Sequence, residues 1–336
     1  MSAQLQSNGQ PVAADAFSLL DDIVAKSKVA KTDTEHARAK DIIGELVKEV
    51  LQGTVVVSDN LSATLDARIA EIDRLISDQL SEVMHAAEFQ KDARFTVLVG
   101  DTTNDVILAM NNGKKPFSDV RVRRAITHAI DKKEVVKGAM FGFGRVLGSN
   151  VDPLNPYFVD LANAMPHDPA KAKKLLAEAG YPNGFEAVLK VAPQYYYTVR
   201  TGEILVSQLQ KVGVKVKIEQ IEWGQWLSRV WREADYDLTI IGHAEPWDIN
   251  NYANPKYYFR YDSPKFQEVF RKSEVTLEDR ARRELYVQMQ KMLVEDAPVV
   301  WLYVHPRLAV TKKGLQGLWK DLPIPAFDLS EVAWAK

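Results

Sequence analysis

The most chemically loaded stretch of the sequence lies between residues 242 and 261. Glu245 and Asp248 stand there among aromatic residues. Two carboxylates beside rings suit a cationic amine, because the acid pairs with its charge and the rings stack on its body. The same two acids would alternatively suit glycoside hydrolysis, which needs a facing carboxylate pair. Nothing in the sequence places Glu245 and Asp248 on facing strands, so the pattern favours a ligand-binding module over an enzyme.

The candidate ligand-binding residues centre on that stretch. A run of three tyrosines, Tyr195–Tyr197, offers a ring from a separate segment, although packing in a core would explain the run equally well. The predicted set is Gly242, His243, Ala244, Glu245, Trp247, Asp248, Tyr252 and Tyr195. The other histidines fall in unrelated elements with no pair at metal-ligand spacing, and the chain has no cysteine. Neither a metal site nor a cofactor is therefore predicted.

An alternation of strand and helix patterns positions this stretch. The predicted strands are Glu186–Val191, Val214–Ile221, Tyr236–Gly242 and Pro298–Val304, and the predicted helices are Thr198–Lys211, Gly224–Glu233, Lys265–Ser273 and Leu277–Glu295. Such alternation predicts an α/β fold with a mostly parallel sheet covered by helices. Ligands bind these sheets beyond the carboxyl ends of the strands, and the candidate stretch directly follows one such end.

Residues 92–184 add two predicted strands, Phe95–Val99 and Val106–Met110, and a helix capped by Asp119. That helix carries three arginines, Arg121, Arg123 and Arg124. No aromatic residues are interleaved with them, so the pattern indicates a solvated helix face and not a nucleic-acid patch. The net charge of −2 agrees, and no nucleic-acid partner is predicted.

The first 91 residues differ in composition from the rest. All seven Trp and all twelve Tyr lie after residue 156, whereas Met1–Lys91 holds 15 acidic and 9 basic residues. Apolar residues at steps of three and four from Leu65 to Ala87 predict one long amphipathic helix. An all-α segment is expected, with a boundary at Lys91–Asp92. No signal peptide is predicted at the amino terminus, and no window reaches the roughly 18 apolar residues of a membrane-spanning helix.

Three phrases carry a resemblance within this segment: DTEHARAKDIIGEL at 33–46, GTVVVSDNL at 53–61 and EVMHAAEFQK at 82–91. They are similar to the large sheath subunit of type VI secretion systems. The likeness stops at Lys91, where that family continues into its sheath-forming core. It implies a partner-seeking helical segment, and the expected partner is the small sheath subunit, contacted through residues 15–91.

A second series of phrases runs through the remainder of the chain. It comprises DVRVRRAI at 119–126, AIDK at 129–132, HDPAKAKKLLAEAGYPNGF at 167–185, GVKV at 213–216, ADYDL at 234–238 and EDAPV at 295–299. From about Arg94 to Lys336 the chain therefore resembles the carboxy-terminal half of family 5 solute-binding proteins. That family contains the dipeptide and oligopeptide receptors of ABC importers.

The resemblance gives the candidate stretch a role. In the family, the ligand-reading loop has the phrase Gly-Trp-x-x-Asp, whose acid holds the amino group of the ligand. This chain has Gly242-His243-Ala244-Glu245 instead. Glu245 keeps the charge on a longer arm, and His243 replaces the tryptophan. An amine-bearing ligand or a peptide still fits, with the backbone of Gly242 to Ala244 available for pairing with an extended ligand.

The resemblance also implies a fold, a truncated two-lobed structure of the class II periplasmic-binding-protein type. Residues 92–184 and 306–336 would form part of the first lobe and residues 185–305 the second. Hinge crossings are expected near Phe185–Val191 and Pro298–His305. Ligand would be buried by hinge closure in an interlobe cleft, and loss of part of one lobe would weaken binding.

The expected function of this chimera-like chain is the substrate-binding component of an ABC-type importer for peptides or related amine-bearing solutes. Its expected partners are the permease subunits. The resemblance implies the periplasm, whereas the chain as written would remain in the cytoplasm for want of a signal peptide. Two alternatives stay open: a structural component of a type VI secretion sheath that docks through its amino-terminal helices, and a glycoside hydrolase that uses Glu245 and Asp248.

Overall fold

The computed structural model of the protein describes residue 79 and residues 91–245, 248–324 and 326–335. The chain divides into two units, Met1–Ile69 and Ala70–Lys336, and every described residue belongs to the second. The predicted all-α segment therefore lies outside the described residues, apart from Gln79 and Lys91. Among the described helices, none combines the length and the apolar character needed to cross a membrane.

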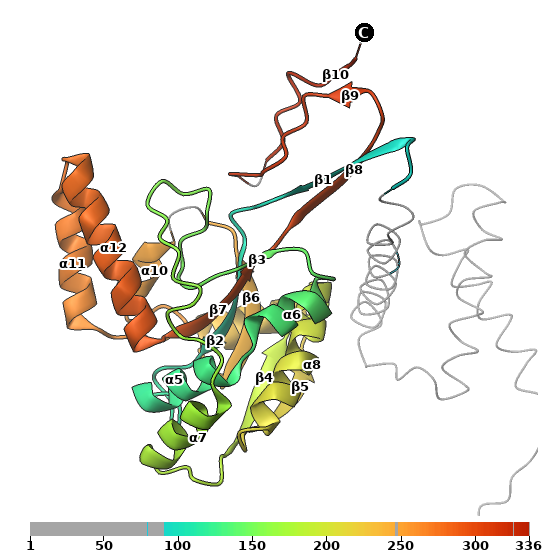
Figure 1. The fold of residues 1–336 in the computed structure, drawn as a ribbon. Coiled ribbons are helices and arrows are strands. Elements are labelled where there is room, and N and C mark those ends of the chain that lie inside the picture. Colours follow the sequence, from blue (N-terminus) through green and yellow to red (C-terminus); the bar gives the residue numbers. More distant parts are fainter. Residues whose placement is uncertain (1–78, 80–90, 246–247, 325, 336) are drawn as a thin grey trace, which may run out of the picture. The chain divides into compact units, whose positions relative to one another are not determined.

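A six-stranded sheet is the centre of the described part (Figure 1), with the strand order β3-β7-β2-β6-β4-β5. Its members are β2 (Asp105–Met110), β3 (Arg145–Val146), β4 (Glu186–Val191), β5 (Lys215–Gln220), β6 (Leu238–His243) and β7 (Val299–Val304). The strands predicted after residue 185 are confirmed to within two residues at each end.

The strand directions correct one prediction. β4 is parallel to β5 and to β6, whereas β2 lies between β6 and β7 and is antiparallel to both. β3 is antiparallel to β7. The sheet is therefore mixed and not mostly parallel. The four strands after residue 185 do share one direction, as their alternation with helices requires, but that alternation carries no information about a strand inserted from earlier in the chain.

Helices and aromatic loops cover both faces of the sheet. One face packs against α5 (Val120–Ala129), α6 (Lys132–Ala139), α7 (Pro169–Glu178) and α8 (Tyr196–Gln210). The other packs against α9 (Trp223–Gln225), the π-helix η1 (Trp226–Arg232), α10 (Ile249–Ala253), α11 (Pro264–Val275) and α12 (Asp279–Asp296). Successive residues of β2 point to opposite faces, so Val106 and Leu108 join one core and Ile107 the other.

Three of the predicted helices after residue 185 are confirmed to within two residues, and these form α8, α11 and α12. The fourth, expected at Gly224–Glu233, is not a single α-helix. It begins as one α turn, α9, and continues as the seven-residue π-helix η1. π-Helical turns are rare in proteins, and those that occur are often found at functional sites. A hydrophobic pattern with a period of 3.6 residues does not predict them.

On α5, the arginine prediction is corrected at one position. Asp119 caps the helix as expected, by accepting from the backbone N–H of Arg121. Arg123, however, is only 7% exposed. Its guanidinium donates to the backbone oxygens of Asp296 (2.8 Å) and Phe117 (2.9 Å), which joins α5 to the end of α12. Buried carbonyl groups need hydrogen-bond donors, and this is why Arg123 is buried although the sequence predicted a solvated helix face.

A separate two-stranded ribbon joins β1 (Phe95–Gly100) to β8 (Arg307–Lys312), and a short pair joins β9 (Leu315–Gln316) to β10 (Ala333–Trp334). The chain passes between the ribbon and the six-stranded sheet twice, after β1 and after β7. The two passages are tied together, because the Thr102 hydroxyl donates to the His305 carbonyl at 2.7 Å. The backbone N–H of His305 in turn donates to the Asn104 carbonyl at 2.8 Å.

This arrangement bears on the expected hinges. β4 is hydrogen-bonded on both sides within the sheet, so the crossing expected near Phe185–Val191 is wrong: this segment is an interior strand. β2 and β3 precede residue 185 yet pair with β7, so the sheet runs across the boundary expected at 184–185. The assignment of residues to two lobes stays a prediction.

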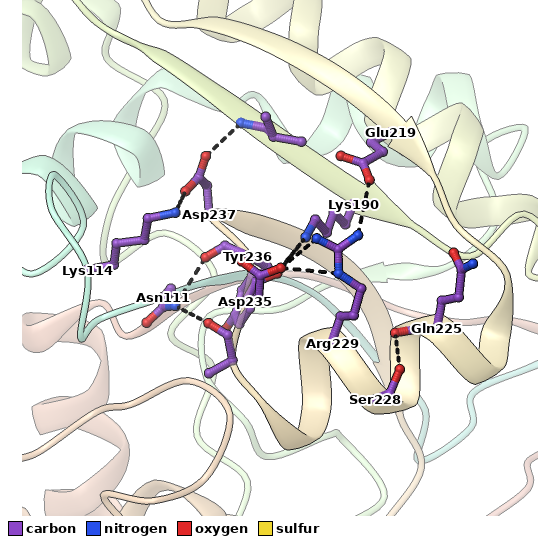
Figure 2. Close-up of polar contacts among 12 residues, drawn as sticks. Asn111, Lys114, Lys190, Glu219, Gln225, Ser228, Arg229, Asp235, Tyr236 and Asp237 are labelled. Atoms are coloured by element: carbon purple, nitrogen blue, oxygen red, sulfur yellow. Dashed lines mark hydrogen bonds and ion pairs between the residues drawn. The ribbon is translucent and has the colours of Figure 1, made fainter.

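Ion pairs hold the amino end of β6 (Figure 2). Asp237 accepts from Lys114 at 2.6 Å and from the backbone N–H of Val188 at 3.0 Å. Asp235 pairs with Arg229 of η1 at 2.6 Å. These paired charges lie at the end of the strand opposite to His243, so the two ends of β6 differ in their chemistry.

Replacing Arg123 with Met should lower the free energy of unfolding by about 2–4 kcal/mol, because buried carbonyl groups lose their donors. Arg121→Met is the matched control on the same helix. It removes solvent-exposed contacts with Asp119 and with the Glu178 carbonyl, and exposed contacts contribute little to stability. Denaturant unfolding of both variants measures the difference. Equal losses would show that the buried contacts of Arg123 contribute nothing specific.

Candidate functional site

The candidate site lies at one edge of the six-stranded sheet. The carboxyl ends of β4, β5, β6 and β7 meet there, together with the amino end of β2. Asp105, the first residue of β2, stands opposite His243 of β6 and Val304 of β7. Loops that follow parallel strands converge at this kind of edge, which is where ligands bind in open α/β sheets.

His243 ends β6 with its ring inside the protein, 7% exposed. Its Nε2 is 2.9 Å from the Tyr258 hydroxyl, and the two rings are nearly parallel. Its Nδ1 is 3.7 Å from Glu245 Oε2 and 3.7 Å from Asp248 Oδ2, and it has no hydrogen-bond partner among the described residues. Burial lowers the pKa of His243 to about 4, so the imidazole is neutral near pH 7.

Three buried carboxyl groups gather beside His243, and we call Asp105, Asp152 and Asp248 the acidic cluster. Burial raises the pKa of Asp248 to about 7, and the negative charges of Glu245 and Asp152 add to that effect. Burial also raises the pKa of Asp105 well above its usual range, again with help from its acidic neighbours. No lysine or arginine of the described part forms an ion pair with the three, and burial disfavours the ionised form of each.

Unpaired acceptors surround the acidic cluster. Asn150 donates to Asp248 Oδ1 at 3.0 Å, but its own Oδ1 has no partner. Asp105 Oδ1 and Asn104 Oδ1 are likewise buried without a hydrogen bond in the described part of the chain. Buried polar atoms nearly always have hydrogen-bond partners. A concentration of unpaired acceptors at one edge of the sheet therefore indicates a place that lacks a hydrogen-bond donor.

Gly242 is required by its close neighbours. A Cβ at this position would lie 2.1 Å from Asn104 Oδ1 and 2.8 Å from the Tyr197 hydroxyl. That hydroxyl is within hydrogen-bonding reach of both the Gly242 backbone and the Asn104 side chain. Pairing between β4 and β6 ends at Thr239, so Tyr197 of α8 takes the position beside β6 that a longer β4 would occupy.

The structure brings most of the predicted residues to this edge. The Ala244 carbonyl accepts from the Thr103 hydroxyl at 3.3 Å, and the Glu245 side chain is 67% exposed. Tyr195 precedes α8, half-buried, with its ring edge-on to Trp223. Trp247 lies outside the described residues. Tyr252 is in the core, stacked on Phe259, with its hydroxyl accepting from Trp301.

Several residues of the edge escaped sequence reasoning. Asn104 and Asp105 stand at the start of β2 and approach His243 because β2 pairs with β6. Asn150 and Asp152 belong to the proline-rich loop after β3, and Asn150 reaches the site by donating to Asp248. His305 was predicted to have no metal-binding role. It is half-buried, with its ring edge-on to Tyr197 at 5.1 Å. A signal was present only for Asp105, an acid at the head of an otherwise apolar strand.

The chemistry of this edge is that of binding. Among the described residues, no group of three or more acids, histidines or cysteines is arranged to hold a metal ion. Exposed Glu245 and an adjacent aromatic wall offer a charge and ring faces to a cationic guest. Glu245 and Asp248 flank the same imidazole nitrogen, and nothing in their geometry sets up a nucleophile.

Comparison with known proteins identifies the family. A family model for bacterial extracellular solute-binding proteins, family 5 (middle region), matches residues 54–265. The chain belongs to this family. The matched range includes all of β2 to β6 and the whole loop from Gly242 to Asp248.

Curated bacterial binding proteins also match the chain. Heme-binding protein A of Haemophilus influenzae is 28% identical over 236 residues, which is 66% of this chain and 43% of that protein. The dipeptide-binding protein of Escherichia coli is 28% identical over 250 residues, 70% of this chain and 46% of that protein. The chain therefore spans about half the length of the curated relatives it matches.

Solved structures agree on the fold. A dipeptide-binding protein from Pseudoalteromonas sp. SM9913, in complex with Met-Leu, superposes with a TM-score of 0.61 at 26% identity. The superposition covers 74% of this chain and 53% of that one. The described part is thus similar to proteins of the family 5 fold, as the sequence predicted. The family match begins at residue 54, before the expected boundary at Lys91–Asp92, and the sheath resemblance stays a prediction.

Gly242→Ala should disturb the edge, because the new Cβ would overlap Asn104 and Tyr197. We expect a loss of about 1–3 kcal/mol of stability, as for other overpacked positions. Gly224→Ala is the control, since its Cβ would meet only the end of the flexible Glu222 side chain. Adding Asn104→Ala to the Gly242 variant should recover part of the loss in thermal unfolding. Strictly additive effects would contradict the proposed contact.

Asp248→Asn should change how stability depends on pH. The folded pKa of Asp248 is about 7, above the unfolded value of about 3.9, so the folded state binds the extra proton between these values. Stability from this group is therefore greatest at low pH and is lost as the pH rises through 7. The gain of the variant over wild type should grow by up to about 1.4 kcal/mol per pH unit from pH 4 to 7.

His243 acts in the opposite direction, because its lowered pKa makes stability rise with pH between about 4 and 6.5. The difference between the curves of variant and wild type, measured by denaturant unfolding, therefore isolates Asp248 better than the wild-type curve alone. Asp262→Asn, at an exposed acid of the same loop region, is the control and should give a flat difference. A flat difference for Asp248→Asn as well would refute the raised pKa.

Proposed function

We propose that this chain is the substrate-binding component of an ABC-type importer for peptides or related amine-bearing solutes. The observation that carries the proposal is the exposed carboxylate of Glu245, at the edge where the parallel strands end. It sits beside a neutral imidazole and uncharged aromatic rings, with no positive side chain paired to it in the described part. An ammonium group supplies the positive charge that these surroundings lack.

The names of the matched relatives support the same class of function. They are binding proteins for dipeptides, glutathione and heme. On this proposal the chain binds and delivers a solute and does not transform it, in contrast to the glycoside hydrolase alternative. The permease subunits of an importer are the proposed partners, and the periplasm is the proposed location.

The ligand would be held by closure of two lobes. The passages after β1 and after β7 are the proposed hinge, because they are the two places where the chain leaves the six-stranded sheet for the ribbon of β1 and β8. Asn104 and His305 lie in these passages and contact each other and Tyr197. Movement of these passages would therefore change the surroundings of Gly242.

Isothermal titration with the dipeptide Met-Leu tests the proposal, and N-acetyl-Met-Leu removes the ammonium from the same probe. Wild type should prefer the free amine, and Glu245→Gln should weaken its binding by about 10- to 100-fold, the worth of one charge-assisted hydrogen bond. Glu186→Gln, an exposed acid at the other end of β4, is the control and should bind as wild type does. Equal binding of both peptides by wild type would refute the role of Glu245.

A further inference from the structure

The acidic cluster poses a charge problem that the proposed role of Glu245 does not resolve. Asp105, Asp152 and Asp248 are each at most 5% exposed, and nothing in the described part pairs them with a lysine or arginine. Burying a charge without a partner costs several kcal/mol, so ionisation of these carboxyl groups is disfavoured. Below its pKa of about 7, Asp248 therefore holds a proton in the empty site.

Unsatisfied atoms point into the same place. His243 Nδ1 is 3.7 Å from Glu245 and from Asp248 and has no hydrogen bond, and the free lone pairs of Asn150 Oδ1 and Asp105 Oδ1 lie nearby. All three side chains are at least nine-tenths buried. Three unpaired groups around a carboxyl show that its surroundings are incomplete in the empty protein, since buried polar groups normally find partners.

Glu245 connects this cluster to the outside. Its carboxylate is exposed, yet its charge still makes ionisation of Asp248 harder. A cation that pairs with Glu245 cancels this repulsion. Asp248 then gains by ionising, because Asn150 already donates to its Oδ1 and the guest brings positive charge within reach of His243 and Asp248.

We propose that the acidic cluster exchanges a proton for the cation of the guest: when an ammonium group pairs with Glu245, the proton on Asp248 leaves to solvent. The reactants are the ammonium, the Glu245 carboxylate and the Asp248 carboxylic acid. The products are the bound ammonium, both carboxylates and one released proton, so charge balances. No covalent bond other than the O–H of Asp248 breaks. This exchange rests on the proposed function and adds its regulation by pH.

Asp248 is the group assigned, and not Asp105, because the effect of Glu245 reaches Asp248 while Asp105 responds to Asp248 and Asp152. The titratable groups that face Asp248 come from every element around it. They are Asp105 of β2, Asp152 of the loop before α7, His243 of β6, Glu245 of the following loop, Tyr252 of α10, and Tyr257 and Tyr258 of the loop before α11. Among the described residues these are acids, phenols and one neutral imidazole, with no lysine or arginine paired to Asp248.

The pH range follows from the groups involved. A peptide ammonium stays protonated below about pH 7, by its ordinary pKa. Below its own pKa of about 7 the empty Asp248 holds its proton. Binding of Met-Leu should then release close to one proton at pH 6, and its association constant should rise by up to tenfold per pH unit from 5.5 to 6.5.

The proton count is measured directly by isothermal titration of Met-Leu in two buffers with different ionisation enthalpies, such as phosphate and imidazole. Wild type should release about one proton at pH 6 by this linkage. Asp248→Asn should bind without release and with an affinity that no longer rises from pH 5.5 to 6.5. Asp262→Asn, an exposed acid outside the site, should behave as wild type.

A second variant guards against misfolding of the first. Asn150→Ala removes the donor that favours ionised Asp248, so it should move the release to higher pH. Binding by wild type without proton release overturns the exchange and leaves the binding function standing, as does unchanged release in Asp248→Asn. Absence of binding by both Met-Leu and its acetylated form in wild type overturns the binding function, and the exchange with it.

Discussion

The placement of β2 between β6 and β7 is the constraint on which the rest of the structure depends. Every residue of this strand is buried, and it is hydrogen-bonded along both edges. Because it runs against its neighbours, its amino end lies where theirs finish. Asp105 is thereby carried to His243, and Asn104 to Gly242. A parallel strand in the same place would have brought its apolar end, Met110, to the site instead.

The two ends of β6 differ in whether the acidic residues beside them are paired with cations. At its amino end, Asp235 and Asp237 are paired with Arg229 and Lys114, so their charges are neutralised within the fold. At its carboxyl end the acids have no lysine or arginine partner among the residues the structure describes, and several acceptors there are unsatisfied. A sequence selected only for stability would satisfy these groups or replace them with apolar ones. Local departures from the rules of good packing are concentrated where a ligand is expected.

Much of the fold could be predicted from the sequence, because it depends on local periodicity. β4, β5, β6 and β7 and the helices α8, α11 and α12 follow apolar patterns that tertiary packing leaves intact. The strand order could not be predicted, since pairing of β2 with β6 joins residues 128 to 138 positions apart. The burial of Arg123 and the π turns of η1 depend on contacts of the same long range.

The candidate site likewise has a part that could be predicted from the sequence and a part that could not. The loop from Gly242 to Asp248 could be recognised, because its residues are neighbours in the chain and share one chemistry. Its buried half could not, because Asp105 and Asn150 reach it only through the sheet and a proline-rich loop. Tyr252 was grouped with the ligand residues by its nearness in sequence, and helix α10 turns its ring into the core instead.

His243 gives this loop its distinct character. A tryptophan, typical of the phrase that the loop resembles, has an N–H donor but no group that titrates. An imidazole in the same position is neutral when buried, yet it has a second nitrogen that lies between the exposed acid and the buried one. The exposed Glu245 carboxylate and the buried Asp248 carboxyl group therefore each lie 3.7 Å from the same imidazole nitrogen. Histidine in place of tryptophan thus exchanges an N–H donor for a buried neutral ring whose Nδ1 has no hydrogen-bond partner in the described part of the chain.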